Sequence, residues 1–181
     1  SNVQGDRTMG IYEQPSEAFL DRLAAEFDFA PPRTPGHDVV GAIAAMERGD
    51  CRVFVAMGGN FAAATPDSAA THAALRNCAL TVQVSTKLNR SHVVHGREAL
   101  MLPCLGRTEI DVQIGGPQAV TVEDSMSMVH LSSGINAPAS QQLLSEPAIV
   151  ARLAAATLPQ STIPWLSLIE DYDRIRERIA K

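Results

Sequence analysis

Apolar and polar positions along the chain predict three short strands, each followed by a polar loop or a proline. Residues 51–57 and 80–84 are apolar runs of strand length, and residues 99–103 form another run that stops at a proline. Between the first two runs, residues 66–77 have the spacing of a helix. This order of strand, helix, strand, loop and strand predicts a parallel sheet with right-handed crossovers.

Helical spacing also recurs outside these strands. Ser16 is a suitable N-cap for a helix over residues 17–27, and Gly49 is a suitable C-cap for a helix over residues 37–48. Two later segments have amphipathic helical spacing: residues 147–156 and 165–180. Together these patterns predict the α/β class, with a Rossmann-like three-layer fold in which a mainly parallel sheet is flanked by helices.

The region after the third strand has a different pattern. Residues 109–114 and 119–123 alternate between apolar and polar positions, which is typical of half-buried strands. A glycine-rich turn at residues 115–117 separates them, so we expect one small antiparallel ribbon here. Residues 132–140 are expected to be a loop.

Composition limits the class of protein further. The chain has 181 residues, which suits one domain with a sizeable core. Hydrophobic residues make up 45% and aromatic residues only 4%, so the core should be aliphatic. Residues 1–15 have no initiator Met and look like a loop from a preceding segment, so the single domain is expected to be a fragment of something larger.

Charge, cysteines and hydropathy exclude several kinds of partner. The net charge of −5, without a Lys/Arg cluster, argues against nucleic acid. Cys51, Cys78 and Cys104 are far apart, which indicates small buried side chains rather than a disulfide framework or a zinc site. No apolar run approaches the ~20 residues that span a bilayer, and no secretory pattern opens the sequence. We therefore expect no membrane partner and a cytoplasmic location.

The candidate site lies in two loops that follow the first two strands. Open α/β folds bind ligands at the carboxyl ends of their strands, so both loops should lie at one edge of the sheet. The first loop offers two glycines and an amide, and the second offers hydroxyls, cations, amides and a histidine. The candidate residues are Gly58, Gly59, Asn60, Ser85, Thr86, Lys87, Asn89, Arg90, Ser91 and His92.

These residue types suit a large, polar, anionic ligand such as a dinucleotide. Glycine lets a backbone approach the ligand, Asn60 can bond a base or ribose, and Lys87 or Arg90 can meet a phosphate. Neither a GxGxxG motif nor a Walker A motif is present, and no residue is assigned as catalytic or as a metal ligand. An alternative interpretation is a stand-alone Rossmann-like nucleotide-binding or scaffold module, in which these loops are ordinary solvated turns.

Five segments in order strengthen the first interpretation: SNVQGDRTMGI (1–11), MGGNFAAATPD (57–67), LTVQVSTKLNRSH (80–92), LPCLGRTEIDVQ (102–113) and VTVEDSMSMVH (120–130). They resemble the molybdopterin-dependent oxidoreductases of the dimethyl sulfoxide reductase superfamily, in particular the formate-dehydrogenase-like alpha subunits. The resemblance covers the middle α/β domain of such a subunit only, which implies that the larger protein is a multidomain oxidoreductase.

The resemblance implies a cofactor and several partners. The full-length enzyme would hold molybdenum and molybdopterin guanine dinucleotide, to which the two loops and the opening Asn2, Gln4 and Gly5 would contribute. If the full-length enzyme carries an iron–sulfur cluster, which the resemblance leaves open, the cluster would lie outside this chain. The expected partners are the remaining domains of the same polypeptide and a small-molecule substrate, with formate as the model, and the isolated fragment is expected to be inactive.

Overall fold

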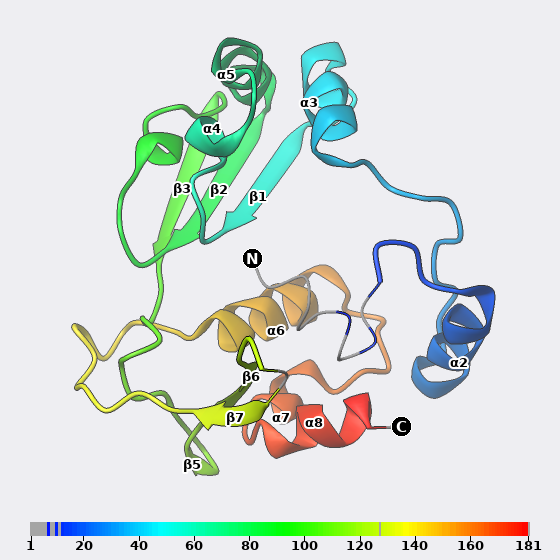
Figure 1. Cartoon of the computed structure of the whole chain (residues 1–181), viewed down its shortest axis with the longest axis vertical. Helices are drawn as coiled ribbons and strands as arrows, with labels where there is room; N and C mark the ends of the chain where they lie inside the picture. The colour runs from blue at the N-terminus through cyan, green and yellow to red at the C-terminus, as the bar shows by residue number, and fades with distance from the viewer. Residues whose placement is uncertain (1–6, 8–9, 11, 127, 181) are drawn as a thin grey trace. The chain divides into compact units, whose positions relative to one another are not determined.

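The computed structural model describes residues 7, 10, 12–126 and 128–180. The chain divides into two compact units (Figure 1). We call Gly36–Leu105 with Gln142–Glu146 the sheet unit, and Ser1–Pro35, Gly106–Gln141 and Pro147–Lys181 together the ribbon unit. The division does not test the expectation of a single domain, because one domain can contain two compact units.

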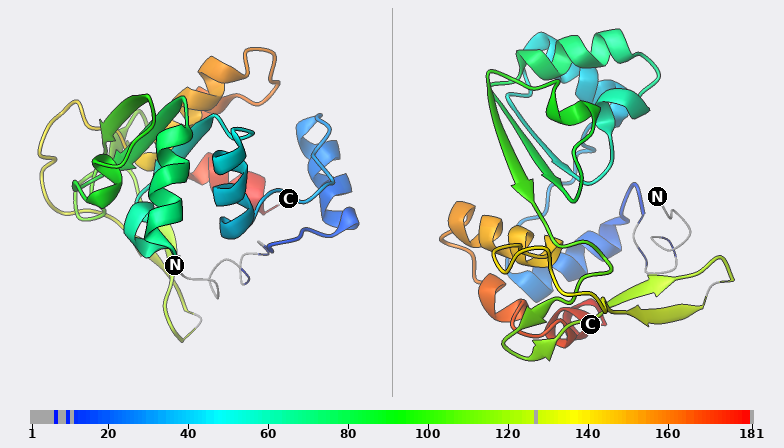
Figure 2. Two further views of the ribbon diagram at one scale, coloured as in Figure 1. Left: turned by 90° about the horizontal axis from the view of Figure 1, so that it is seen from above. Right: turned by 90° about the vertical axis from the view of Figure 1, so that its left-hand side faces the viewer.

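The sheet unit contains a three-stranded parallel sheet in the order β1-β2-β3. Its elements are α3 (Val39–Arg48), β1 (Val53–Met57), α4 (Phe61–Ala64), α5 (Ser68–Asn77), β2 (Leu80–Ser85), the 3₁₀ turn η1 (Arg90–His92) and β3 (Glu98–Pro103). Figure 2 shows α3 and α5 on one face of this sheet. The predicted α/β class, with a parallel sheet and flanking helices, is thereby confirmed.

Capping side chains set the helix boundaries in this unit. Asp38 accepts the Gly41 N–H at 2.7 Å, so α3 begins at Val39 rather than at residue 37. Gly49 ends the same helix with φ +80°, as predicted. Asp67 caps α5 by accepting the Ala70 N–H at 2.9 Å.

The core of the sheet unit lies between its helices and the sheet. Its buried members are small or aliphatic, and they pack against partly buried Ile43, Cys51, Phe54 and Phe61. These members are Met46, Ala62, Ala74, Leu75, Cys78 and Val94. Cys78 and Cys104 are buried as expected and Cys51 is half-buried, while burial raises the pKa of the Cys78 thiol. The low aromatic content therefore gives a tight aliphatic core.

The ribbon unit combines helices with two short antiparallel ribbons. Its elements are α2 (Glu17–Phe27), β4 (Val112–Gln113), β5 (Gly116–Pro117), β6 (Val120–Glu123), β7 (Val129–Ser132), α6 (Glu146–Thr157), α7 (Trp165–Leu168) and α8 (Asp173–Ile179). Ser16 caps α2 by accepting the Phe19 N–H, as the sequence predicted. Among the described residues, every helix is too short or too polar to span a bilayer.

The prediction of one ribbon from residues 109–114 and 119–123 is wrong. β4 pairs with β5 across a tight turn at Ile114 and Gly115, and β6 pairs with β7 instead. The second pairing depends on Asp124, whose carboxylate accepts the N–H groups of Met126 and Met128 and so closes the turn.

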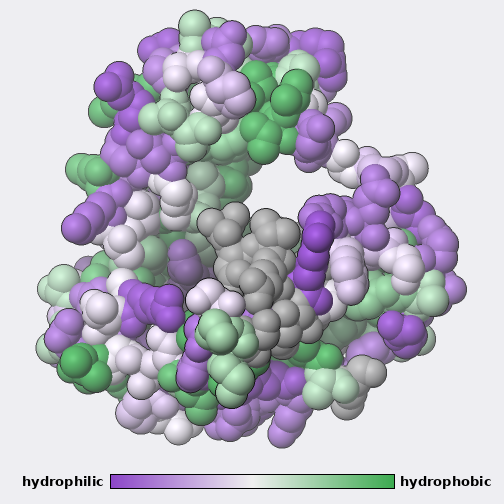
Figure 3. Space-filling view, viewed as in Figure 1, coloured by the Kyte–Doolittle hydropathy of each residue, from purple (hydrophilic) through white to green (hydrophobic). Residues whose placement is uncertain are grey.

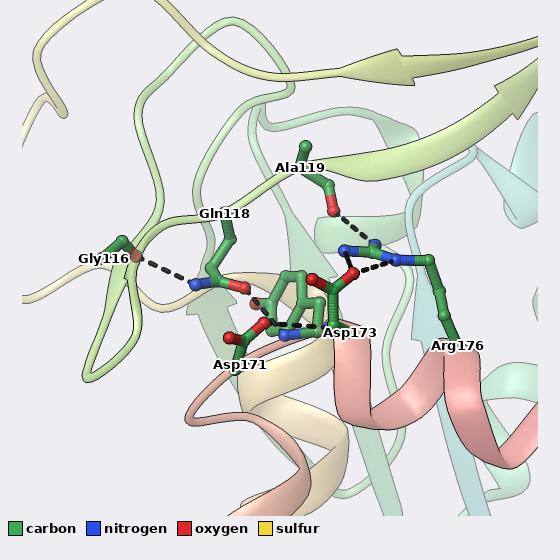
Figure 4. Close-up of polar contacts among 7 residues, drawn as sticks. Gly116, Gln118, Ala119, Asp171, Asp173 and Arg176 are labelled. Carbon is green, nitrogen blue, oxygen red and sulfur yellow. Dashed lines mark hydrogen bonds and ion pairs between the residues drawn. The ribbon is translucent and has the colours of Figure 1, made fainter.

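The prediction of one helix over residues 165–180 is also wrong, because the helix is interrupted between α7 and α8. At this interruption the Tyr172 N–H donates to Gln118 Oε1 at 2.8 Å, and the Tyr172 hydroxyl donates to Asp111 Oδ2 at 2.5 Å. Gln118 also donates to the Gly116 carbonyl, and Arg176 donates to Asp173 and to the Ala119 carbonyl (Figure 4). The bonds of Tyr172 and Arg176 to residues 111–119 span 54 to 61 residues, and they override the local helical pattern.

Candidate functional site

The first candidate loop leaves β1 through two glycines in the left-handed region. Gly58 and Gly59 have φ values of +67° and +69°, which L side chains rarely adopt. A Cβ built on either glycine has no described atom within 4 Å, so the space beside this backbone is open. The Gly58 N–H donates to the Val84 carbonyl at 2.8 Å and fixes the start of the loop to β2.

The second candidate loop leaves β2, whose last residue is Ser85 rather than the predicted Val84. Ser85 Oγ donates to the Lys87 carbonyl at 2.7 Å and accepts the Lys87 N–H, which makes a tight turn. Asn89 then caps η1, because its Oδ1 accepts the Ser91 N–H at 2.9 Å while its own N–H donates to His92 Nδ1 at 3.0 Å.

Hydrogen bonds join the two loops side by side at the carboxyl end of β1 and β2. Asn89 Nδ2 donates to the Gly59 carbonyl at 2.7 Å. Ser91 Oγ donates to Asn60 Oδ1 at 3.2 Å and accepts the Ala62 N–H at 3.0 Å. The expectation that both loops lie together at one edge of the sheet agrees with these contacts.

Burial divides the candidate residues into two groups. Ser91 and His92 are 1% and 5% exposed, and Asn89 is half-buried, so these three side chains hold the loops in place. Thr86, Lys87 and Arg90 are exposed. Within the described part of the chain, neither the Lys87 ammonium nor the Arg90 guanidinium has an ion-pair or hydrogen-bond partner.

The arrangement can bind an anion but has no evident nucleophile. Lys87 and Arg90 flank Asn89, whose side chain bonds the Gly59 carbonyl, and Asn60 keeps its amide nitrogen free among the described contacts. The Ser91 hydroxyl contacts an amide oxygen and a backbone N–H rather than a general base. The geometry therefore suits a charged ligand that is held, not one that is attacked by a side chain.

Three of the candidate residues, Asn2, Gln4 and Gly5, lie outside the described residues. His72 was not expected at the site, yet its Nε2 meets the Ala62 carbonyl at 2.8 Å and holds α4 beside the first loop. His72 and Ala62 are ten residues apart in sequence, and no local sequence motif indicates their contact.

Comparison with known proteins identifies relatives of this chain. No protein-family model matches it. It is 59% identical over 181 residues, 99% of its length, to a protein of Mycobacterium tuberculosis named an uncharacterized oxidoreductase, and equally to one of Mycobacterium bovis. It is 54% identical over 179 residues to the protein YdeP of Escherichia coli. The chain spans only 23% of the mycobacterial proteins and 24% of YdeP, about a quarter of their length.

Proposed function

We propose that this chain is a molybdopterin guanine dinucleotide-binding domain of a molybdenum-dependent, formate-dehydrogenase-like oxidoreductase, and one segment of a longer polypeptide. The observation that carries the proposal is the pair of loops joined by Asn89 and Ser91 at the carboxyl ends of two parallel strands. Two findings support it: relatives of high identity are named oxidoreductases, and those relatives are about four times longer than the chain.

The residues present fit part of such a dinucleotide. The open space beside Gly58 and Gly59 admits a bulky group against the backbone, and a Cβ at either position would intrude on it. Lys87 and Arg90 supply unpaired positive charge for a pyrophosphate. Asn60 can donate its amide N–H groups to a base or ribose. When bound, the molybdenum and its pterin supply the redox chemistry.

The protein's contribution in this proposal is position and electrostatics. Asn89 and Ser91 act on the ligand indirectly, because they bond the two loops together, and His92 acts through Asn89, whose N–H it accepts. Ser85 shapes the turn that presents Lys87, and Thr86 lies exposed within that turn. In the whole enzyme, which we propose to be cytoplasmic, the substrate would be formate or a similar small molecule, and the partners would be the remaining domains of the same polypeptide.

The proposal is tested on the full-length polypeptide with the double substitution Asn60→Leu and Lys87→Glu. Losing a hydrogen bond to a charged group costs about 1.5–3 kcal/mol, so guanine-dinucleotide binding should weaken at least about tenfold. The measurement is the guanine nucleotide and molybdenum released per polypeptide after acid treatment.

A matched control is Arg97→Glu, which reverses an exposed charge at the opposite end of the sheet, just before β3. This control should keep its nucleotide. If the double variant retains full nucleotide occupancy and the unfolding temperature of the parent, the site assignment is wrong. A parent protein that releases no guanine nucleotide, although it is folded and made in cells that supply the cofactor, would favour the alternative of a nucleotide-binding or scaffold module.

A further inference from the structure

The sheet of the sheet unit has one face that its own helices do not cover. Side chains alternate along β1, so Phe54 points into the helix-covered core while Val53, Val55 and Met57 lie on the opposite face. These three side chains are 54%, 50% and 41% exposed, and Leu100 on β3 is 46% exposed. Hydrophobic side chains reach the surface of this unit (Figure 3).

The strand register shows which side chains share this open face. Residues paired across parallel strands project to the same side, so the face consists of three rows. The rows are Val53–Leu80–Glu98, Val55–Val82–Leu100 and Met57–Val84–Leu102. Eight of the nine side chains are apolar, and the one charge, on Glu98, lies at a corner. Val84 is only 2% exposed and Leu80, Val82 and Leu102 are half-buried, so the exposed apolar area lies on β1 and at Leu100.

The helix-covered face is less apolar than the open one. Thr81 and Gln83 of β2 project towards the helices, and both are buried, while Met101 on β3 shares their face at the sheet edge and is 45% exposed. A sheet whose more apolar face is exposed to water is unfavourable, because burying an aliphatic side chain stabilises a fold relative to leaving it exposed. Parallel sheets also occur almost only with both faces covered.

We propose that an amphipathic helix from a part of the full-length polypeptide outside these 181 residues packs on this open face. The proposal rests on the part of the proposed function that makes the chain one segment of a longer polypeptide. The length of the relatives supports this occupant, because about three quarters of each lies beyond the matched region. A helix with an aliphatic stripe matches eight apolar positions and one peripheral carboxylate, whereas a charged partner would leave its charges desolvated.

The test uses the full-length polypeptide with p-benzoylphenylalanine in place of Val55. Irradiation should link position 55 to a peptide outside the 181 residues, within a monomer, and mass spectrometry should identify a segment with helical apolar spacing. The matched control is the same photoreactive residue in place of Val40, a 71%-exposed valine on α3. A link from position 55 to residues of this chain, a covalent dimer, or the same peptide from both positions would overturn the proposal.

A second readout covers the case in which no crosslink forms. The Val55→Cys variant should react with a water-soluble maleimide at least about tenfold more slowly than the Val40→Cys variant, because a covered side chain reacts only through local opening. Equal rates would overturn the proposal. Leu100→Cys replaces Val55→Cys if the latter lowers the unfolding temperature. Guanine nucleotide is measured in the same samples, so that the two proposals are tested separately. If position 55 is protected in protein without nucleotide, the helix on the open face is supported and the dinucleotide site is not.

Discussion

In the sheet unit, six apolar side chains are buried against one another, whereas in the ribbon unit a few polar side chains connect segments far apart in sequence. The sheet-unit cluster is built around Met46 and Leu75, which are fully buried. In the ribbon unit, Tyr172 reaches Asp111 across 61 residues and Arg178 reaches Glu26 across 152. The difference indicates that side-chain volume controls stability in the first unit and individual hydrogen bonds control it in the second.

The largest expected effect comes from glycines where two backbones touch, a feature that both units share. A Cβ at Gly134 in the ribbon unit would lie 2.0 Å from the Glu109 carbonyl oxygen, and a Cβ at Gly96 in the sheet unit 2.5 Å from that of Cys78. Backbone cannot move aside as a side chain can, so Gly134→Ala and Gly96→Ala should each cost about 4 kcal/mol or more. Urea unfolding measures the cost. Gly36→Ala, where no described atom lies within 4 Å, should be nearly neutral.

The next effect tests whether packing dominates the sheet unit. Leu75 is 0% exposed, and Leu75→Ala should cost about 3 kcal/mol through lost transfer energy and a cavity. Hydrogen exchange of the β2 amides would show the loss. Leu88→Ala removes the same atoms from a side chain that is 78% exposed, and should change stability by less than about 0.5 kcal/mol. Similar costs for both leucines would contradict a packing-controlled unit.

The corresponding test in the ribbon unit removes a single oxygen. Tyr172→Phe keeps the ring but deletes the 2.5 Å bond to Asp111, and should cost about 2 kcal/mol because the acceptor is a carboxylate. Fluorescence of Trp165, the one tryptophan in the sequence, reports unfolding of this unit. Tyr12→Phe changes an exposed tyrosine and serves as the control. An unchanged urea midpoint for Tyr172→Phe would refute control by hydrogen bonds.

A smaller effect is expected at the joined loops, where the sheet unit also relies on polar contacts. Asn89→Ala removes the cap of η1 and the bond to the Gly59 carbonyl, and should cost about 1 kcal/mol. The Ser91 amide, which donates to Asn89, should then exchange faster with solvent. Thr86→Ala alters an exposed neighbour and should leave that amide protected.

The smallest expected effect is a pH dependence of the stability of the ribbon unit. Hydrogen bonding, chiefly from His130, lowers the pKa of Asp124 from its ordinary 3.8, and backbone N–H donors, first that of Gly106, lower the pKa of Glu109 from 4.5. Both carboxylates lie in the ribbon unit. A lowered folded pKa gives stability that is present above the ordinary value and is lost as pH falls through the folded pKa.

The Trp165 unfolding midpoint in urea should therefore decrease between pH 5 and pH 3. The combined variant Asp124→Asn and Glu109→Gln should show a weaker decrease over the same range. A decrease of equal size in parent and variant would mean that other carboxylates are responsible.

Local signals predicted much of this structure, and distant contacts account for what they missed. Ser16, Gly49 and Asp67 bond within a few residues of themselves, so the helices they cap could be read from the sequence. Apolar runs likewise located the three parallel strands. The interruption of residues 165–180 depends instead on Tyr172 and its partner Asp111, which no local pattern connects.

The sequence predicted where the candidate site lies but not which of its residues face a ligand and which join the loops. Both loops could be placed because each follows an apolar strand. The functions of Ser91 and Asn89 depend on bonds that span 29 to 31 residues, so ligand-facing and loop-joining side chains look alike in sequence. Burial is what separates Lys87 and Arg90 from Ser91 and His92.

The order in which the chain passes through its two units bears on how it is made. Gly36–Leu105 supplies nearly all of the sheet unit in one uninterrupted stretch, and Leu144 returns later to accept the Leu105 N–H at 2.9 Å. The ribbon unit must instead gather three stretches, with Glu26 at one end and Arg178 at the other. During vectorial synthesis we expect the sheet to assemble on the ribosome before α8 is made and can bond to α2, which protease resistance of stalled nascent chains would reveal.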